Sequence, residues 1–172
     1  MTDQVYLDYN ASAPLRPEAR AAMVDALGMV GNPSSVHAQG RQARRLVEEA
    51  RAAVASLLHA TPAAVVFSSG GTEANALAIR RCGRPRVLVS AVEHDSVLSA
   101  VPDAEVVPVD AHGLVRLDVL AEMLAASDEP ALVALMLVNN ETGVVQPVAA
   151  AAEIAHARGA LLHCDAVQAA GR

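Results

Sequence analysis

From residue 86 onward the sequence alternates short apolar runs with segments of helical periodicity, and this alternation restricts the fold more than any other feature. Strands that alternate with helices are typical of βαβ units, so we predict an α/β fold with a mostly parallel sheet and flanking helices. The predicted strands span 86–90, 105–109, 131–138 and 160–164, and the predicted helices between them span 95–101, 117–126 and 147–158.

The N-terminal part of the chain is more helical. Residues 18–29 follow Pro17 and carry apolar residues at helical spacing, and residues 36–59 show a longer apolar stripe. Turn-forming residues separate the two helices at 31–35. We expect two parts. The first is an N-terminal segment, residues 1–35, which contains one short helix, and the second is a partial α/β domain, residues 36–172.

Composition excludes several classes of protein. The 172 residues are 53% hydrophobic but only 2% aromatic, which indicates a core of Ala, Val and Leu. The net charge of −6 argues against nucleic acid as a main partner. No apolar run reaches the length of a membrane span, and the first four residues lack the features of a signal peptide, so we expect a cytoplasmic protein. Two cysteines without CxxC spacing indicate neither a metal site nor a disulfide framework.

The segment 65–79 combines a predicted strand at 65–67, the pair Gly70 and Gly71, and a predicted helix from Thr72. A helix N-terminus that follows glycines favours an anion such as phosphate, to which the hydroxyls of Ser69 and Thr72 could add hydrogen bonds. The alternative is ordinary helix capping with Thr72 as the N-cap residue.

Polar side chains also follow four predicted strands, where a parallel sheet binds its ligands. Each group has an ordinary structural explanation, but together they would face one edge. The buried acid Asp165 in particular needs a positive or hydrogen-bonding partner. A phosphate site, an acid, an amide and a histidine together suit pyridoxal phosphate. The groups are Ser68-Ser69, Glu93-His94, Asn139-Asn140-Glu141, and Asp165 with Gln168.

Several motifs in this order closely resemble the cysteine desulfurase family of class V aminotransferases, which are pyridoxal phosphate enzymes of fold type I. The resemblance covers essentially the whole chain. It implies the large cofactor-binding domain of that fold, in an incomplete form. The motifs are YLDYNASAP at 6–14, GNPSS at 31–35, SGGTEAN at 69–75, EH at 93–94, NNETGVVQ at 139–146 and HCDAVQ at 163–168.

The resemblance implies roles for individual residues. Gly71 and Thr72 match the pair that binds the cofactor phosphate. His94 matches the histidine that stacks on the cofactor ring and helps in proton transfer. Asn140 and Gln168 match the amides near the ring oxygen.

Asp165 matches the acid that binds the pyridine nitrogen. The implied reaction moves sulfur from L-cysteine to a protein thiol and releases alanine, as in iron–sulfur cluster assembly. A sulfur-acceptor protein and a homodimer of the full-length protein are the implied partners.

The sequence departs from the family in its nucleophiles. It contains no lysine, because all 13 basic residues are arginine, and the family binds its cofactor covalently through a lysine. Cys82 and Cys164 do not match the sulfur-accepting cysteine, and family members are longer, with a second small domain. We therefore expect an inactive N-terminal fragment. The alternatives are a lysine-free pseudoenzyme or partner-binding half-domain, and an enzyme of the selenocysteine lyase type.

Overall fold

The computed structural model describes residues 5–171 and divides the chain into two compact units. The first unit ends at Phe67 and the second begins at Ser68. The four residues used in the signal-peptide argument lie outside the described part. The boundary between residues 35 and 36 stays a prediction.

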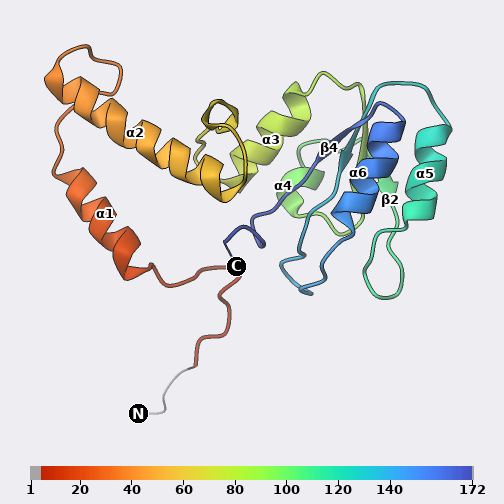
Figure 1. Ribbon diagram of the computed structural model, residues 1–172. Helices are drawn as coiled ribbons and strands as arrows, with labels where there is room; N and C mark the ends of the chain where they lie inside the picture. Colours follow the sequence, from red (N-terminus) through yellow and green to blue (C-terminus); the bar gives the residue numbers. More distant parts are fainter. Residues whose placement is uncertain (1–4, 172) are drawn as a thin grey trace. The chain divides into compact units, whose positions relative to one another are not determined.

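The first unit is helical, as its sequence predicts (Figure 1). Helix α1 spans Pro17–Leu27 and begins at the proline, whose missing N–H costs nothing at a first helical position. Helix α2 spans Ala38–Leu57, and the Nδ1 atom of His37 accepts a hydrogen bond from the Gly40 N–H at 3.3 Å. A 3-10 turn, η1, spans Pro62–Ala64. Among the described residues of this unit only Gly40 and Ala55 are buried.

The prediction of a strand at 65–67 is wrong. This segment is irregular, and Val66 and Phe67 are exposed. A strand needs a neighbouring backbone to hydrogen bond with, but the Val65 carbonyl instead accepts a hydrogen bond from the Arg51 guanidinium. That guanidinium also lies 5.1 Å from the centre of the Phe67 ring. Side-chain contacts with α2 therefore replace a sheet ladder here.

The second unit contains a four-stranded sheet in which all strands are parallel, which confirms the predicted α/β class. The spatial order is β2-β1-β3-β4. The two inner strands are buried along their whole length, as expected for strands covered on both faces. The strands are β1 at Arg86–Ser90, β2 at Glu105–Val107, β3 at Ala131–Ala134 and β4 at Leu161–His163.

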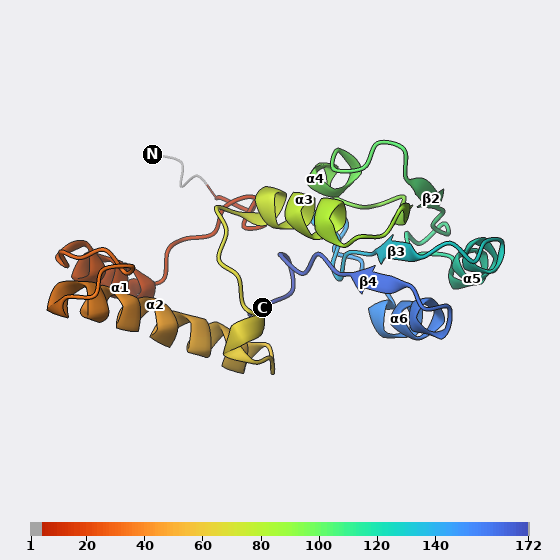
Figure 2. The same cartoon turned by 90° about the horizontal axis from the view of Figure 1, so that it is seen from above.

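Helices cover both faces of this sheet (Figure 2). On one face α3 and α4 pack against side chains of β1 and β3, and on the other face α5 and α6 do so. The buried side chains are almost all aliphatic, which confirms the core predicted from the composition. The helices are α3 at Gly71–Arg81, α4 at Asp95–Leu98, α5 at Leu117–Ala125 and α6 at Val148–Ala157.

Strand β3 is shorter than the predicted 131–138, because the chain folds back on itself. The Leu135 N–H still donates to the carbonyl of His163, the last residue of β4, at 3.0 Å, and the Leu137 N–H donates to the carbonyl of Asp165, just after β4, at 2.9 Å. Val138 instead forms an antiparallel bridge with Val145. Gly143 turns the chain between them with a φ of 72°, in the left-handed region that glycine adopts without strain.

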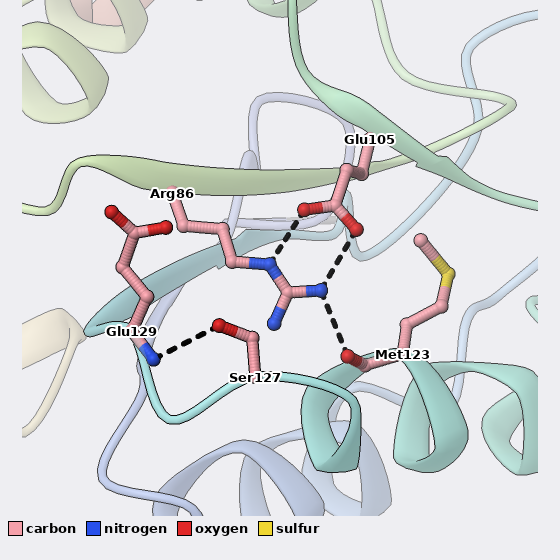
Figure 3. Close-up of polar contacts among 5 residues, drawn as sticks. All are labelled: Arg86, Glu105, Met123, Ser127 and Glu129. Carbon is pink, nitrogen blue, oxygen red and sulfur yellow. Dashed lines mark hydrogen bonds and ion pairs between the residues drawn. The ribbon is translucent and has the colours of Figure 1, made fainter.

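Arg86, the first residue of β1, connects this strand to β2 and α5 (Figure 3). Its Nε and Nη2 atoms donate to the two oxygens of Glu105 on β2, at 2.5 and 2.8 Å. Nη2 also donates to the Met123 carbonyl of α5 at 2.8 Å. The hydrogen bond with Glu105 raises the pKa of Arg86, so the guanidinium remains charged although its side chain is almost fully buried.

Candidate active site

Three adjacent strands deliver polar residues to the same edge of the sheet. Glu93 and His94 follow β1, Asn139 and its neighbours follow β3, and Asp165 follows β4. The connection from β1 places α4 on one face, whereas the connection from β3 places α6 on the other. Parallel sheets bind ligands where the connections diverge in this way, so the carboxyl ends of β1 and β3 are the expected site. Ser68 and Ser69 are the exception, because they follow no strand.

Two buried polar side chains tie the loops after β1 and β3 together. Glu93 accepts a hydrogen bond from the Met136 N–H at 2.7 Å, and the Asn139 amide donates to the Val92 carbonyl at 3.0 Å. Burial raises the pKa of Glu93 to about 7, and the nearby Asp165 charge acts in the same direction, while the Met136 hydrogen bond opposes them. A carboxyl that titrates near neutral pH therefore lies beside the predicted site.

Helix α3 begins at Gly71, with Gly70 as its N-cap residue. The alternative of Thr72 as N-cap is therefore wrong, because Thr72 lies inside the first turn. Glu73 reaches back so that its Oε2 atom accepts from the Ser69 N–H and hydroxyl, at 2.7 and 2.5 Å. These bonds lower the pKa of Glu73. The Ser69 hydroxyl, which the sequence suggested as a phosphate ligand, is therefore already bonded to Glu73. The N–H groups in the first turn of α3 are the remaining donors for an anion.

Gly71 lies against the segment that carries the predicted acid. A Cβ atom at this residue would come within 3.3 Å of the Val167 Cγ2 atom, which is tighter than an ordinary van der Waals contact. A side chain at residue 71 would therefore crowd the turn after β4. The glycine allows the N-terminus of α3 and the turn at Asp165 to approach each other.

Asn75 of α3 joins this helix to the end of β4. Its Nδ2 atom donates to the Asp165 Oδ2 atom at 2.8 Å and to the Ser96 Oγ atom at 3.0 Å. Its Oδ1 atom lies 2.9 Å from the His163 Nε2 atom. The other Asp165 oxygen accepts from the Val167 N–H at 3.0 Å. The predicted acid is half-buried, not fully buried as expected, and it accepts a hydrogen bond on each oxygen.

The Ser96 hydroxyl extends this network to His94. The His94 Nδ1 atom lies 2.8 Å from Ser96 Oγ and accepts from the Ser96 N–H at 3.1 Å, so His94 caps the short helix α4. His94 and Thr72 line one open pocket of about 470 Å³. The structure therefore brings two of the predicted site residues to one pocket and connects a third, Asp165, to that pocket's wall.

The chain matches the protein-family model of the class-V aminotransferases over residues 5–172. The chain belongs to this family. A cysteine desulfurase from Cereibacter sphaeroides is 45% identical, in an alignment that covers 99% of this chain and 47% of the relative. Among the described residues, 5–171, no helix is long and apolar enough to span a membrane, and no group of His, Cys, Asp and Glu residues could hold a metal ion.

Solved structures of similar proteins share the fold. The NifS-like protein from Rickettsia africae ESF-5 superposes with a TM-score of 0.90 at 34% identity, over 96% of this chain and 48% of that protein. SspA, solved in complex with cysteine, superposes with a TM-score of 0.85 at 28% identity, over 92% of this chain and 49% of that protein. The chain thus spans about half the length of the relatives that it matches.

Asn140 and Gln168 are the two amides predicted to lie near the ring oxygen. The hydrogen bonds described above, which connect Asn75, Asp165, Ser96 and His94, do not include either of them. The Asn140 side chain donates to Glu141 Oε1 at 2.7 Å within its own loop. Gln168 is half-buried in the turn after β4. Their roles near the ring oxygen stay predictions.

Sequence reasoning missed Asn75, Ser96 and His163 as members of the site. Asn75 is 4% exposed inside a helix, where asparagine is a poor helix former, and this combination indicates a tertiary contact. His163 precedes Asp165 by two residues in an extended segment, so both side chains lie on one face. The spacing of His163 and Asp165 can be recognised in the sequence, whereas the burial of Asn75 is known only from the tertiary structure.

Proposed function

We propose that this chain supplies the phosphate-binding helix end and the ring-binding acid of a pyridoxal phosphate site in a cysteine desulfurase. The observation that carries the proposal is the 2.8 Å hydrogen bond from Asn75 of α3 to Asp165, which brings the two halves of such a site together. Pyridoxal phosphate is the cofactor of the family to which the chain belongs. The proposed substrate of the whole protein is L-cysteine, which the similar SspA structure contains.

The residues at the N-terminus of α3 fit the phosphate of this cofactor. The first N–H groups of an α-helix have no acceptor within the helix, and the helix dipole favours an anion there. Gly71 excludes a side chain from this point, and Thr72 lines the pocket next to His94. We assign Gly71 and Thr72 to the phosphate.

The environment of Asp165 fits a carboxylate that faces a protonated pyridine nitrogen. Both of its oxygens accept hydrogen bonds, from Val167 N–H and Asn75 Nδ2, so the carboxyl group is held in a fixed orientation. When bound, the cofactor supplies an electron sink for the substrate, and a protonated ring nitrogen strengthens it. We assign His94 to ring stacking and proton transfer, and Asn140 and Gln168 to the ring oxygen.

The covalent steps are not assigned to residues of this chain. The sequence contains no lysine that could bind the cofactor covalently. Burial raises the pKa of Cys164 to about 11, and the charges of Glu93 and Asp165 act in the same direction, so this thiol stays protonated at neutral pH. The thiolate is the nucleophilic form, which makes Cys164 unsuited to attack a sulfur atom. The sulfur acceptor, the homodimer and the cytoplasmic location stay predictions.

A titration of the 172-residue chain with pyridoxal phosphate tests the proposal. We expect reversible binding that inorganic phosphate competes away and that borohydride does not make permanent, because no lysine is present. Asp165→Asn should weaken binding about 10- to 100-fold, since one charge-assisted hydrogen bond contributes roughly 1.5–3 kcal/mol. Asp128→Asn, at an exposed residue, is the matched control and should bind like the unchanged chain.

Two results would contradict the proposal: affinity that is equal for Asp165→Asn and the control, or affinity that phosphate does not affect. The absence of lysine also favours a second candidate, a lysine-free domain that binds the cofactor or a partner without chemistry of its own. Sulfide release from cysteine on addition of a lysine-bearing partner chain would support the desulfurase. Binding without sulfide release under those conditions would support the second candidate.

A further inference from the structure

The Asn75 amide lies at the centre of a polar network in which the direction of each hydrogen bond, from donor to acceptor, is determined. An ionised carboxylate only accepts hydrogen bonds, so the group that faces Asp165 Oδ2 at 2.8 Å must be the Asn75 NH₂. This places the second hydrogen of the same NH₂ toward Ser96 Oγ, at 3.0 Å. It also turns the Asn75 oxygen toward His163. The charge of Asp165 therefore sets the orientation of the amide.

The orientation of the amide determines the proton position on His163. The Asn75 Oδ1 atom can only accept, so the His163 Nε2 atom, 2.9 Å away, must carry a hydrogen. Burial lowers the pKa of His163, although the Asp165 charge opposes this effect. A lowered pKa favours the neutral ring, and a neutral imidazole has a single N–H. That hydrogen lies on Nε2.

The same order reaches His94 through Ser96. The Ser96 hydroxyl accepts from Asn75, so its own hydrogen is available for the His94 Nδ1 atom at 2.8 Å. The Ser96 N–H points to the same nitrogen, at 3.1 Å. Two donors therefore meet at Nδ1, so this nitrogen acts as an acceptor and carries no hydrogen. The hydrogen of His94 then lies on Nε2.

We infer that Asn75 is a positioning residue for His94. Asp165 orients the Asn75 amide so that it donates to the Ser96 hydroxyl, and this hydroxyl in turn donates to His94 Nδ1, which holds the His94 proton at Nε2. This network uses three segments of the second unit, namely α3, the start of α4 and the end of β4. Under the proposed function, on which this consequence rests, Nε2 is the His94 atom that exchanges a proton with a ligand. Nδ1 is occupied by its two donors.

Two-bond ¹H–¹⁵N spectra of the ¹⁵N-labelled full chain test the inference, because they distinguish the two histidine tautomers. The His94 signal is assigned by its loss in His94→Gln. We expect an unprotonated Nδ1 and a protonated Nε2 for both His94 and His163 above neutral pH. A protonated Nδ1 on His94, or an averaged pair of signals, would overturn the inference. The spectra need no cofactor, so a failure to bind pyridoxal phosphate would leave this result intact.

Two variants separate a directed network from a general loss of structure. Asn75→Leu removes the amide and should shift both His94 and His163 toward a mixture of tautomers. Ser96→Ala removes the hydroxyl donor but keeps the backbone N–H donor at His94 Nδ1, so it should shift His94 part of the way toward a mixture while His163 keeps its pattern. The exposed His112 is the internal control and should not change. Unchanged histidines in a folded Asn75→Leu chain, or an equal effect of Ser96→Ala on His163, would contradict the inference. If Asn75→Leu does not fold, Ser96→Ala and the unchanged chain still decide the outcome.

Discussion

Gln146, the last residue of the motif at 139–146, connects two loops near the carboxyl edge of the sheet. Its side chain is 3% exposed. Oε1 accepts from the Val115 N–H at 2.9 Å, and Nε2 donates to the Gly113 carbonyl at 2.7 Å. One amide thus satisfies two backbone groups that have moved out of water, and a side chain without hydrogen-bonding atoms would leave both unsatisfied.

We predict that Gln146→Leu lowers the free energy of unfolding by about 2–4 kcal/mol, since each buried group that loses its partner costs roughly 1–3 kcal/mol. Urea denaturation measures this change. Gln42→Leu, on an exposed face of α2, is the matched control and should change the free energy by less than about 0.5 kcal/mol. Equal effects of the two substitutions would show that the Gln146 contacts do not stabilise the fold.

Glu93 gives the protein a specific dependence of stability on pH. The pKa of its carboxyl rises from 4.5 to about 7 on folding, so between these values the folded chain binds more protons than the unfolded chain. The free energy of unfolding should therefore fall as pH rises from about 4.5 to 7, and this contribution should level off above pH 7. The total change due to Glu93 is on the order of 3 kcal/mol.

Urea denaturation at several pH values checks this prediction. Glu93→Gln should remove the decline attributed to Glu93, whatever its effect on stability at any one pH. The exposed Glu153→Gln should keep the decline. A Glu93→Gln chain whose stability follows pH as the unchanged chain does would rule out a raised pKa at this residue.

At the scale of secondary-structure elements, the ion pair between Arg86 and Glu105 joins β1 to β2 and to the end of α5 (Figure 3). Arg86 is buried, whereas the Glu105 side chain is 43% exposed. The Arg86 Nη1 atom has no hydrogen-bond partner among the described residues. The guanidinium therefore depends on Glu105 and Met123 for compensation of its buried charge.

We predict that Glu105→Gln destabilises the chain by about 1–2 kcal/mol, less than for a fully buried pair because water reaches this carboxylate. In an Arg86→Met background the same substitution should cost little, since no buried charge remains. A double-mutant cycle by urea denaturation measures the difference. Equal costs in both backgrounds would mean that the pair is not coupled.

The sequence predicted an element correctly where residues within or next to that element determine it. The prediction was wrong where the backbone hydrogen bonds of a segment depend on a partner elsewhere in the chain. The helices at 17–27 and 38–57 follow from Pro17, apolar spacing and turn residues. The segment 65–67 is as β-branched as a real strand, but its backbone bonds to Arg51 instead of to another strand. Strand β3 ends early because Val138 pairs with Val145. Neither partner can be recognised from the local sequence.

For the whole molecule, the two units differ in how much they bury. The second unit holds both aliphatic clusters, on the two faces of its sheet. Helix α1 in the first unit has no buried residue, and α2 buries only Gly40 and Ala55. Because burial of apolar side chains is the main stabilising contribution, the units should open at different free energies.

Amide hydrogen exchange followed by mass spectrometry measures this difference. We predict that amides of α1 exchange close to the rate of an unstructured peptide, whereas those of β1 and β3 exchange only through global unfolding. The measurement should be repeated at low and high protein concentration, because association would protect exposed apolar residues. Protection of α1 equal to that of β1 at low concentration would contradict the prediction.

The amino-acid sequence by itself determined the fold class and the family motifs. Alternating apolar runs and helical segments require a parallel sheet covered by helices, since each strand must bury both faces. The sequence also shows that none of these 172 residues is a lysine. The tertiary structure alone decided that Asn75 connects Asp165 to Ser96 and to His163. Hydrogen bonds between residues up to 90 positions apart depend on strand order and helix packing, which local patterns of side chains do not encode.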